Sequence, residues 1–168
     1  MSNYSLEQLN QANRQTFIEY LSDVYEESPW VAERAWTNHP FSGVDELQQT
    51  MERVVEEASG ETQLELLRAH PDLGENTEMT DASEQEQASA GLDQLDPELY
   101  NTFQRLNQTY QEQFDFPFIM AVKDENPESI RREMEGRIEN TPPKEFRTAL
   151  DEVHKIAQLR LEELLASD

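Results

Sequence analysis

Apolar residues recur along this chain at the three- and four-residue intervals of amphipathic helices. In each predicted helix the apolar residues form a stripe on one side and polar residues cover the opposite side. The apolar side of each helix is therefore expected to be buried. We therefore predict an all-α fold, a compact single-domain array of about seven to nine helices over residues 1–168. The stripes are Phe17, Leu21 and Val24; Leu47, Met51 and Val54; Leu99, Phe103, Leu106 and Tyr110; Ile130, Met134 and Ile138; and Phe146, Leu150, Val153, Ala157 and Leu164.

Helix-capping residues indicate where these helices begin. Short polar side chains accept hydrogen bonds from the free N–H groups of the first turn, and proline fits the first helical position. Gly60 is expected to close the helix that starts at Ser42, and the helix from Asp81 is expected to end near Gly91. The predicted starts are Ser5, Ser28, Ser42, Asp81, Asp96, Asn126 and Thr141, four of which precede a proline.

One stretch departs from the helical pattern. The sequence FDFPFIMAVKDE, residues 114–125, has the composition of a short buried strand. An isolated strand has no partner in an otherwise helical chain, so we predict a buried extended segment or irregular turn. Its backbone N–H and C=O groups must find partners, and a ligand is one candidate.

Charge and composition exclude several classes of function. The chain carries 13 basic and 36 acidic residues, a formal net charge of −23, and therefore repels phosphate backbones. We expect no nucleic-acid partner. The acidic residues are spread along the whole length, a pattern typical of proteins adapted to high salt. The absence of cysteine removes disulfides, thiolate nucleophiles and cysteine-bound zinc.

The sequence gives no indication of a membrane protein. Its longest apolar run, residues 116–122, is far shorter than a bilayer span. The start lacks the pattern of a secretory signal, and the end is not a peroxisomal address. We therefore expect a cytoplasmic location.

His70 is the first candidate for chemistry. It lies in the stretch LLRAHPDLGE, where Pro71 pushes it out of the helical region and the preceding helix should end. A histidine at a helix exit beside a loop is well placed to move a proton. The alternative is that His70 only caps the last carbonyl groups of the helix. His39 also precedes a proline, so the dipeptide alone is weak support.

A polar helical face provides the second candidate. On a helix Ser83, Glu86, Gln87 and Ala90 fall within roughly a 100° arc, with Ala88 nearly opposite. The alternative is an ordinary solvated face, which is the rule for such helices.

Arg160 is the third candidate, because it occupies a position on the otherwise apolar seam of the last helix. A buried guanidinium must be paired or hydrogen-bonded. In a structural interpretation it extends to water or pairs with one of the many carboxylates, and in a functional one it binds an anionic ligand. The spacing leaves both interpretations open. His154 and Lys155 fall on flanking faces and are expected at the surface.

Nucleotide and metal chemistry are not indicated. The five glycines are scattered and form no phosphate-binding loop. His39, His70 and His154 have no ligand spacing, and no calcium-loop pattern occurs. We therefore expect no cofactor and no metal.

Taken together, several stretches of the chain resemble the OHCU decarboxylase family of urate degradation, whose members convert 2-oxo-4-hydroxy-4-carboxy-5-ureidoimidazoline to (S)-allantoin. The resemblance extends over most of residues 17–165, in the family's order. The matching stretches are SPWVAERAW, LLRAHPDLG, SEQEQASAGL, LNQTYQEQFDFPFIMAVK and ALDEVHKIAQLRLEELL.

The resemblance implies a cofactor-free, all-α enzyme that is commonly a homodimer, with a small ureidoimidazoline as its ligand. His70 matches the catalytic proton-transfer residue, with Glu86 beside the reacting centre. Lys123 stands where many members have arginine, and no role is assigned to it. The implied substrate-binding residues are Pro71, Ser83, Gln87, Phe118, Ile119, Met120, Ala121, Val122 and Arg160.

Without the resemblance, the leading alternative is a non-catalytic acidic helical module that binds a basic partner. This alternative predicts a stripe of exposed carboxylates on the surface and an Arg160 that is paired inside the protein. A second alternative keeps the pocket but changes the substrate to another ureido or imidazole acid.

Overall fold

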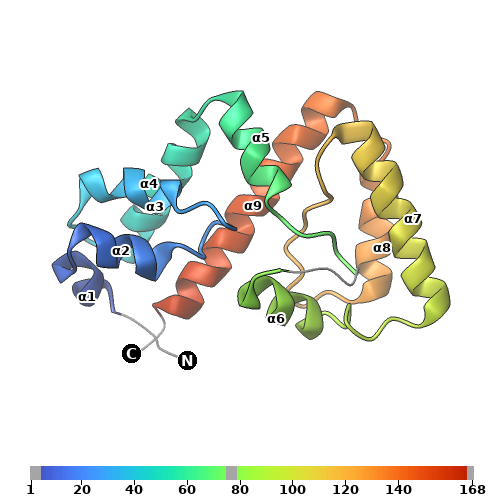
Figure 1. Cartoon of the computed structure of the whole chain (residues 1–168), viewed down its shortest axis with the longest axis horizontal. Helices are drawn as coiled ribbons and strands as arrows, with labels where there is room; N and C mark the ends of the chain where they lie inside the picture. The colour runs from blue at the N-terminus through green and yellow to red at the C-terminus, as the bar shows by residue number, and fades with distance from the viewer. Residues whose placement is uncertain (1–4, 75–78, 166–168) are drawn as a thin grey trace. The chain divides into compact units, whose positions relative to one another are not determined.

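The computed structural model describes residues 5–74 and 79–165, which form nine α-helices and one 3₁₀ helix and contain no strand (Figure 1). The predicted all-α class is therefore confirmed for this part of the chain. The helices are α1 (Leu6–Gln11), α2 (Arg14–Leu21), α3 (Trp30–Ala35), η1 (Trp36–Asn38), α4 (Val44–Glu57), α5 (Gly60–Arg68), α6 (Asp81–Ser89), α7 (Pro97–Phe114), α8 (Pro127–Arg137) and α9 (Pro142–Leu164).

The chain divides into two compact units. The first unit combines Met1–Leu66 with His154–Asp168, and the second is Leu67–Val153. Helices α5 and α9 each contribute residues to both units. The prediction of a single domain over residues 1–168 stays a prediction.

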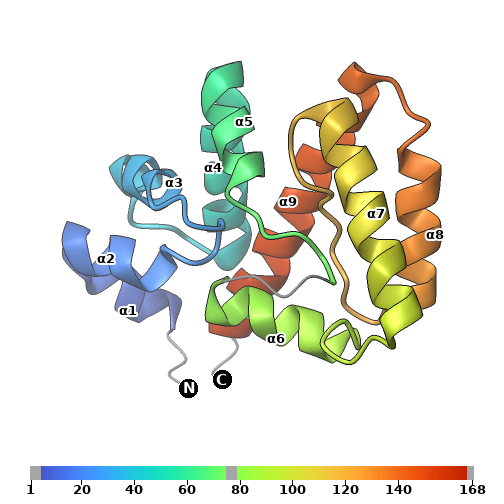
Figure 2. The same cartoon turned by 45° about the vertical axis from the view of Figure 1, so that its right-hand side comes forward.

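The core of the first unit is built where α1 to α4 pack on one another. Figures 1 and 2 both show α3 beside α4. Phe17 of α2 is fully buried and makes an edge contact with Trp36 at 5.2 Å between ring centroids. Leu47 and Met51 of α4 are also fully buried, as their helical spacing predicts.

The second unit contains a cluster of aromatic rings between α7, α9 and the segment that follows α7. Figures 1 and 2 show α7 and α8 side by side. Tyr110 meets Phe118 at 5.4 Å and Phe116 at 5.8 Å between centroids, in the edge-to-face geometry that aromatic rings favour. Phe116 in turn meets Phe146 of α9 at 6.0 Å.

Several predicted helix starts are confirmed. Ser5 and Gln8 form a capping box at α1, and Asp96 caps α7 with Pro97 in its first turn. Asn126 caps α8 in the same way, with Pro127 following it. Each cap supplies an acceptor for N–H groups that have no partner within the helix.

Other predicted boundaries were wrong, because side chains at those positions bond elsewhere. The Ser28 hydroxyl donates to the Glu26 carbonyl, and α3 begins only after Pro29. Gly43, not Ser42, is the N-cap of α4. Ser59 accepts from the Thr62 N–H, so Gly60 opens α5 instead of closing α4.

The buried stripe of α4 and the start of α6 differ slightly from prediction. Val55 of α4 is buried, whereas Val54 is half-buried. Thr80, not Asp81, is the N-cap of α6. No helix among the described residues has the length and apolar character needed to cross a membrane.

Candidate functional site

His70 lies just beyond the end of α5, as its place before a proline predicts. The helix ends at Arg68, and the His70 N–H donates to the Leu67 carbonyl at 3.2 Å. The residue is 8% exposed and Pro71 is half-buried. The imidazole therefore belongs to a largely dry position at the start of a loop.

The loop of residues 71–74 turns tightly after His70. Gly74 has φ +75°, a left-handed conformation that side chains disfavour. A Cβ at this position would meet the Phe103 ring at 3.1 Å and Leu95 at 3.2 Å. Only glycine fits both the turn and the packing.

The predicted polar face of α6 points inward. Ser83 is 4% and Gln87 6% exposed, Ala90 is buried and Glu86 is half-buried. Ala88, which was expected on the core side, is exposed. The alternative of a solvated face is therefore wrong for Ser83 and Gln87. Gln87 can point inward because its carboxamide meets a polar partner there, the loop after His70.

Gln87 connects α6 to that loop through both ends of its carboxamide. Its Oε1 accepts from the Gly74 N–H at 3.0 Å, and its Nε2 donates to the Asp72 carbonyl at 3.1 Å. The Nε2 group also lies 3.6 Å from the sulfur of Met79. The loop backbone thereby gains partners that no helix or sheet supplies.

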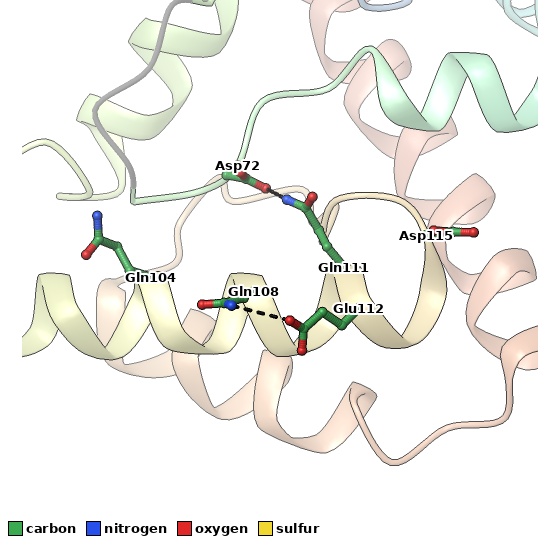
Figure 3. Close-up of a pocket in the computed structure, with 6 residues that line it drawn as sticks. All are labelled: Asp72, Gln104, Gln108, Gln111, Glu112 and Asp115. Carbon is green, nitrogen blue, oxygen red and sulfur yellow. Dashed lines mark hydrogen bonds between the residues drawn. The ribbon is translucent and has the colours of Figure 1, made fainter.

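Two side chains of helix α7 also bind this loop, and neither was identified from the sequence. Asn107 Nδ2 donates to the Leu73 carbonyl at 2.9 Å, and Gln111 Nε2 donates to Asp72 Oδ1 at 2.5 Å. Figure 3 shows the Gln111 side chain rising from α7 toward Asp72. Asn107 is 1% exposed, and its place between Phe103 and Tyr110 on the apolar stripe was the indication available in the sequence.

An open groove of about 640 Å³ runs along α7 beside these residues. It shares Asp72 with the loop, and none of its lining residues is a predicted site residue. Within the described part of the chain, no group of three or more histidine or acidic side chains is placed to hold a metal ion. The groove is lined by Asp72, Gln104, Gln108, Gln111, Glu112 and Asp115 (Figure 3).

Residues 117–122 run without regular secondary structure, as predicted for the apolar stretch. Phe118, Ile119 and Val122 are buried, whereas Met120 and Ala121 are half-buried. Their backbone finds side-chain partners inside the unit, where Arg137 donates to the Ile119 carbonyl at 2.7 Å and Glu152 accepts from the Ala121 N–H at 2.9 Å.

Arg137 is part of a buried charge cluster that the sequence pattern did not reveal. Its guanidinium lies 2.5 Å from the Glu145 carboxylate and over the Phe118 ring at 4.4 Å. The Tyr110 hydroxyl donates to the same carboxylate, which also accepts from Asn140. Burial raises the pKa of the Tyr110 phenol, and its hydrogen bond to Glu145 raises it further.

Arg160 belongs to the first unit, on the buried seam that the 4-3 spacing of α9 predicts. It is 9% exposed, and its guanidinium lies 2.8 Å from the Glu26 carboxylate. It also donates to the Asp23 carbonyl at 2.9 Å. Glu26 is 1% exposed, so the pair is held where solvent screening is weak. The structure thus gives Arg160 the internal partner that one of its two interpretations required.

His154 is not a surface residue, which corrects the prediction; Lys155 is exposed as expected. The His154 side chain is 12% exposed, with Nδ1 2.8 Å from the Tyr25 hydroxyl and Nε2 2.8 Å from Glu56. Burial raises the pKa of Tyr25, and the charges of Glu52 and Glu56 add to the rise.

The remaining two residues singled out from the sequence lie apart from these contacts. His39, which also precedes a proline, lies in the first unit and stacks on Trp36 at 3.5 Å between centroids. Lys123, in the second unit, is exposed in the turn after the apolar stretch.

Comparison with known proteins finds relatives that match nearly the whole chain. A family model described as OHCU decarboxylase matches residues 10–162. The 2-oxo-4-hydroxy-4-carboxy-5-ureidoimidazoline decarboxylase of Haloferax volcanii is 60% identical over 168 residues, with 100% of both chains covered. The protein of the same name from Halalkalicoccus jeotgali is also 60% identical, over 98% of this chain and 93% of its own.

A solved structure agrees with these relatives. The crystal structure of (S)-allantoin synthase superimposes with a TM-score of 0.80 at 30% sequence identity. The match covers 96% of this chain and 54% of that chain. The family model covers most of the chain, and the two relatives are 60% identical to it along nearly their whole length. The chain therefore belongs to the OHCU decarboxylase family.

Proposed function

We propose that this chain removes CO₂ from 2-oxo-4-hydroxy-4-carboxy-5-ureidoimidazoline and delivers one proton to form (S)-allantoin, as a step of urate degradation. The observation that carries the proposal is that a buried His70 directly precedes a loop bound by Gln87, which lies on the inward polar face of α6. Ser83, Glu86 and Gln87 lie on this face, in the same compact unit as His70.

The substrate's own chemistry makes a cofactor unnecessary. Its carboxylate is attached to a carbon next to a ring C=N, so the electrons left by departing CO₂ flow onto that nitrogen. The protein needs to orient the substrate and to control a single proton transfer. We assign His70 as the proton donor and Glu86 as the group that orients the imidazole or the ureido chain.

The other motif residues would shape the binding pocket. Ser83 and Gln87 would read the amide edges of the substrate, and backbone groups of residues 118–122 would contact it, with Pro71 beside them. The two Nε2 protons of Gln87 are directed to Asp72 and Met79, so Gln87 would use the second lone pair of Oε1 as an acceptor.

Arg160 would position the anionic end of the substrate. An arginine that held the departing carboxylate too firmly would stabilise the ground state and would not speed CO₂ loss. We therefore expect Arg160→Ala to raise KM more than it lowers kcat, whereas His70→Asn abolishes kcat and leaves substrate binding largely intact. Equal losses of both parameters in both variants would contradict these roles.

The test follows freshly made substrate by ultraviolet absorbance and the product by circular dichroism. Acceleration with one-handed allantoin supports the enzyme, and His70→Asn is the matched inactive control. An unchanged decay rate with racemic product would refute the proposal.

A second candidate function is the acidic binding module, because Arg160 is paired with Glu26 as that hypothesis required. The same assay separates the two, since a binder leaves the substrate's decay unchanged. A different ureido or imidazole acid as substrate would instead give turnover with that acid and none with the ureidoimidazoline. A homodimer in a cytoplasmic location belongs to the main proposal, and sedimentation of the purified chain tests the dimer.

A further inference from the structure

Three carboxamide side chains bind the loop that follows His70, and they come from two helices. Gln87 of α6 bonds to the Asp72 carbonyl and the Gly74 N–H. Asn107 and Gln111 of α7 bond to the Leu73 carbonyl and the Asp72 carboxylate. Three consecutive loop residues are thus each held by a side chain from another element.

The placement of these amides indicates that they fix the position of the loop and do more than fill space in the core. A carboxamide both donates and accepts, so it can bind backbone C=O and N–H groups without adding a charge. Gln87 and Asn107 are 6% and 1% exposed, and buried hydrogen bonds of this kind define one geometry because breaking them leaves a polar group unpaired. Gly74, packed against Phe103, fixes the far end of the loop.

We propose that Gln87, Asn107 and Gln111 form a clamp on residues 71–74 that holds the His70 imidazole in register for proton transfer. His70 precedes the clamped residues directly, and Pro71 removes one backbone freedom between them. The proposal rests on the proposed function for its catalytic part. It makes Asn107 and Gln111, to which the family resemblance assigned no role, positioning residues for the reaction.

Gln111 offers the sharpest test, because it is half-buried and its substitution leaves the core untouched. Gln111→Glu keeps the shape of the side chain but replaces the donor to Asp72 with a like charge. Gln104→Glu is the matched control, since Gln104 lines the same groove on the same helix and bonds to Tyr100 instead of the loop. Both variants carry the same added charge.

We expect Gln111→Glu to lower kcat about five- to tenfold with little change in KM, and to lower the fraction of (S)-allantoin after correction for spontaneous decay. Gln104→Glu should behave like the parent chain. Adding Asp72→Asn to Gln111→Glu restores a donor–acceptor pair with its direction reversed, and kcat should recover at least in part. Equal kcat in the two single variants, or no recovery in the double variant, would overturn the catalytic part of the clamp.

Hydrogen exchange of the peptide that contains residues 70–74 tests the clamp without substrate. Exchange should be faster in Gln111→Glu than in the parent or in Gln104→Glu, and should slow again with Asp72→Asn. Unchanged exchange would overturn the clamp itself. A parent chain with no activity would refute the proposed function, while the exchange rates would still decide whether the amides hold the loop.

Discussion

Among the residues that the structure describes, each compact unit buries one arginine against a carboxylate, and the two pairs are built differently. Arg137 of the second unit binds Glu145, the Ile119 carbonyl and the face of Phe118. Arg160 of the first unit binds Glu26 and the Asp23 carbonyl. Both carboxylate side chains are 0% exposed, so both pairs lie where an unpaired charge would be costly.

The difference lies in what each pair holds in place. The Glu145 carboxylate also accepts from Tyr110 and Asn140, and Arg137 anchors the irregular segment, so this cluster joins α7, α8, α9 and the segment. The Arg160 pair ties α9 to the turn between α2 and α3, and Arg160 is also the arginine of the family motif. Burial of a charge therefore does not by itself separate a structural arginine from one that is proposed to bind substrate. The partners of the carboxylate are more informative.

The largest effect is expected from Arg137→Ala. It leaves Glu145 buried without its counterion and frees the Ile119 carbonyl, which should cost about 3–5 kcal/mol of the free energy of unfolding. Urea unfolding followed by circular dichroism measures it. Arg131→Ala on the same helix is the control, because Arg131 pairs with Glu128 and Glu135 at the surface. A loss for Arg137→Ala no greater than that of the control would contradict a structural role.

Glu26→Gln should have a smaller effect on stability and an added effect on the substrate. The variant keeps an acceptor for Arg160 and removes the charge, at an expected cost of about 1–3 kcal/mol. If Arg160 holds the anionic end of the substrate, KM should also change. Asp23→Asn is the matched control, because Asp23 accepts from Arg160 through its backbone carbonyl and its side chain is exposed. Similar KM values for the two variants would argue that the pair is purely structural.

Alkaline pH should weaken both units through their buried tyrosines. Tyr25 and Tyr110 have pKa values raised by burial, so the folded chain keeps phenol protons that the unfolded chain loses near pH 10. Stability is therefore full below about pH 10 and falls above it, by up to about 1.4 kcal/mol per pH unit for each phenol. Urea unfolding between pH 9 and 11 should show a shallower slope in Tyr25→Phe and in Tyr110→Phe. A slope identical to the parent's in either variant would show that this tyrosine does not contribute to the loss of stability at alkaline pH.

The smallest effect is expected where the contacts from Tyr25 through His154 to Glu56 reach the surface of the first unit. Glu56 binds His154, but its side chain is 39% exposed, so solvent screens the interaction. Glu56→Gln should change the free energy of unfolding by less than about 1 kcal/mol. The neighbouring exposed Glu57→Gln serves as control, and a loss as large as that of Glu26→Gln would show that exposure is a poor guide here.

Local rules in the sequence predicted what depends on local chemistry. The caps at Ser5, Asp96 and Asn126 are confirmed, because a cap needs only a polar side chain and the first turn of its own helix. The exit of α5 before Pro71 is confirmed for the same reason. Arg160 was recognisable because the seam of α9 is long enough to show a single charge among apolar positions.

Features that depend on distant partners were predicted less well. Gln87 faces inward because a loop thirteen residues earlier in the chain needs its carboxamide, and no periodicity within α6 reports that need. Arg137 was missed because Ile138, one position later, completed an equally good apolar stripe with Ile130 and Met134. The role of Asn107 could be assigned only once the loop that it binds was known.

The irregular segment has one more consequence, for the behaviour of the chain when it unfolds. Residues 116–122 are the longest apolar run in the sequence, and such runs readily form intermolecular β-structure once exposed. In the folded chain Pro117 lacks an N–H, while the Ile119 carbonyl and the Ala121 N–H are taken by Arg137 and Glu152. Two of the backbone groups that a second strand would need are thus already occupied, and Pro117 offers no donor. Loss of Arg137 should therefore promote aggregation as well as unfolding.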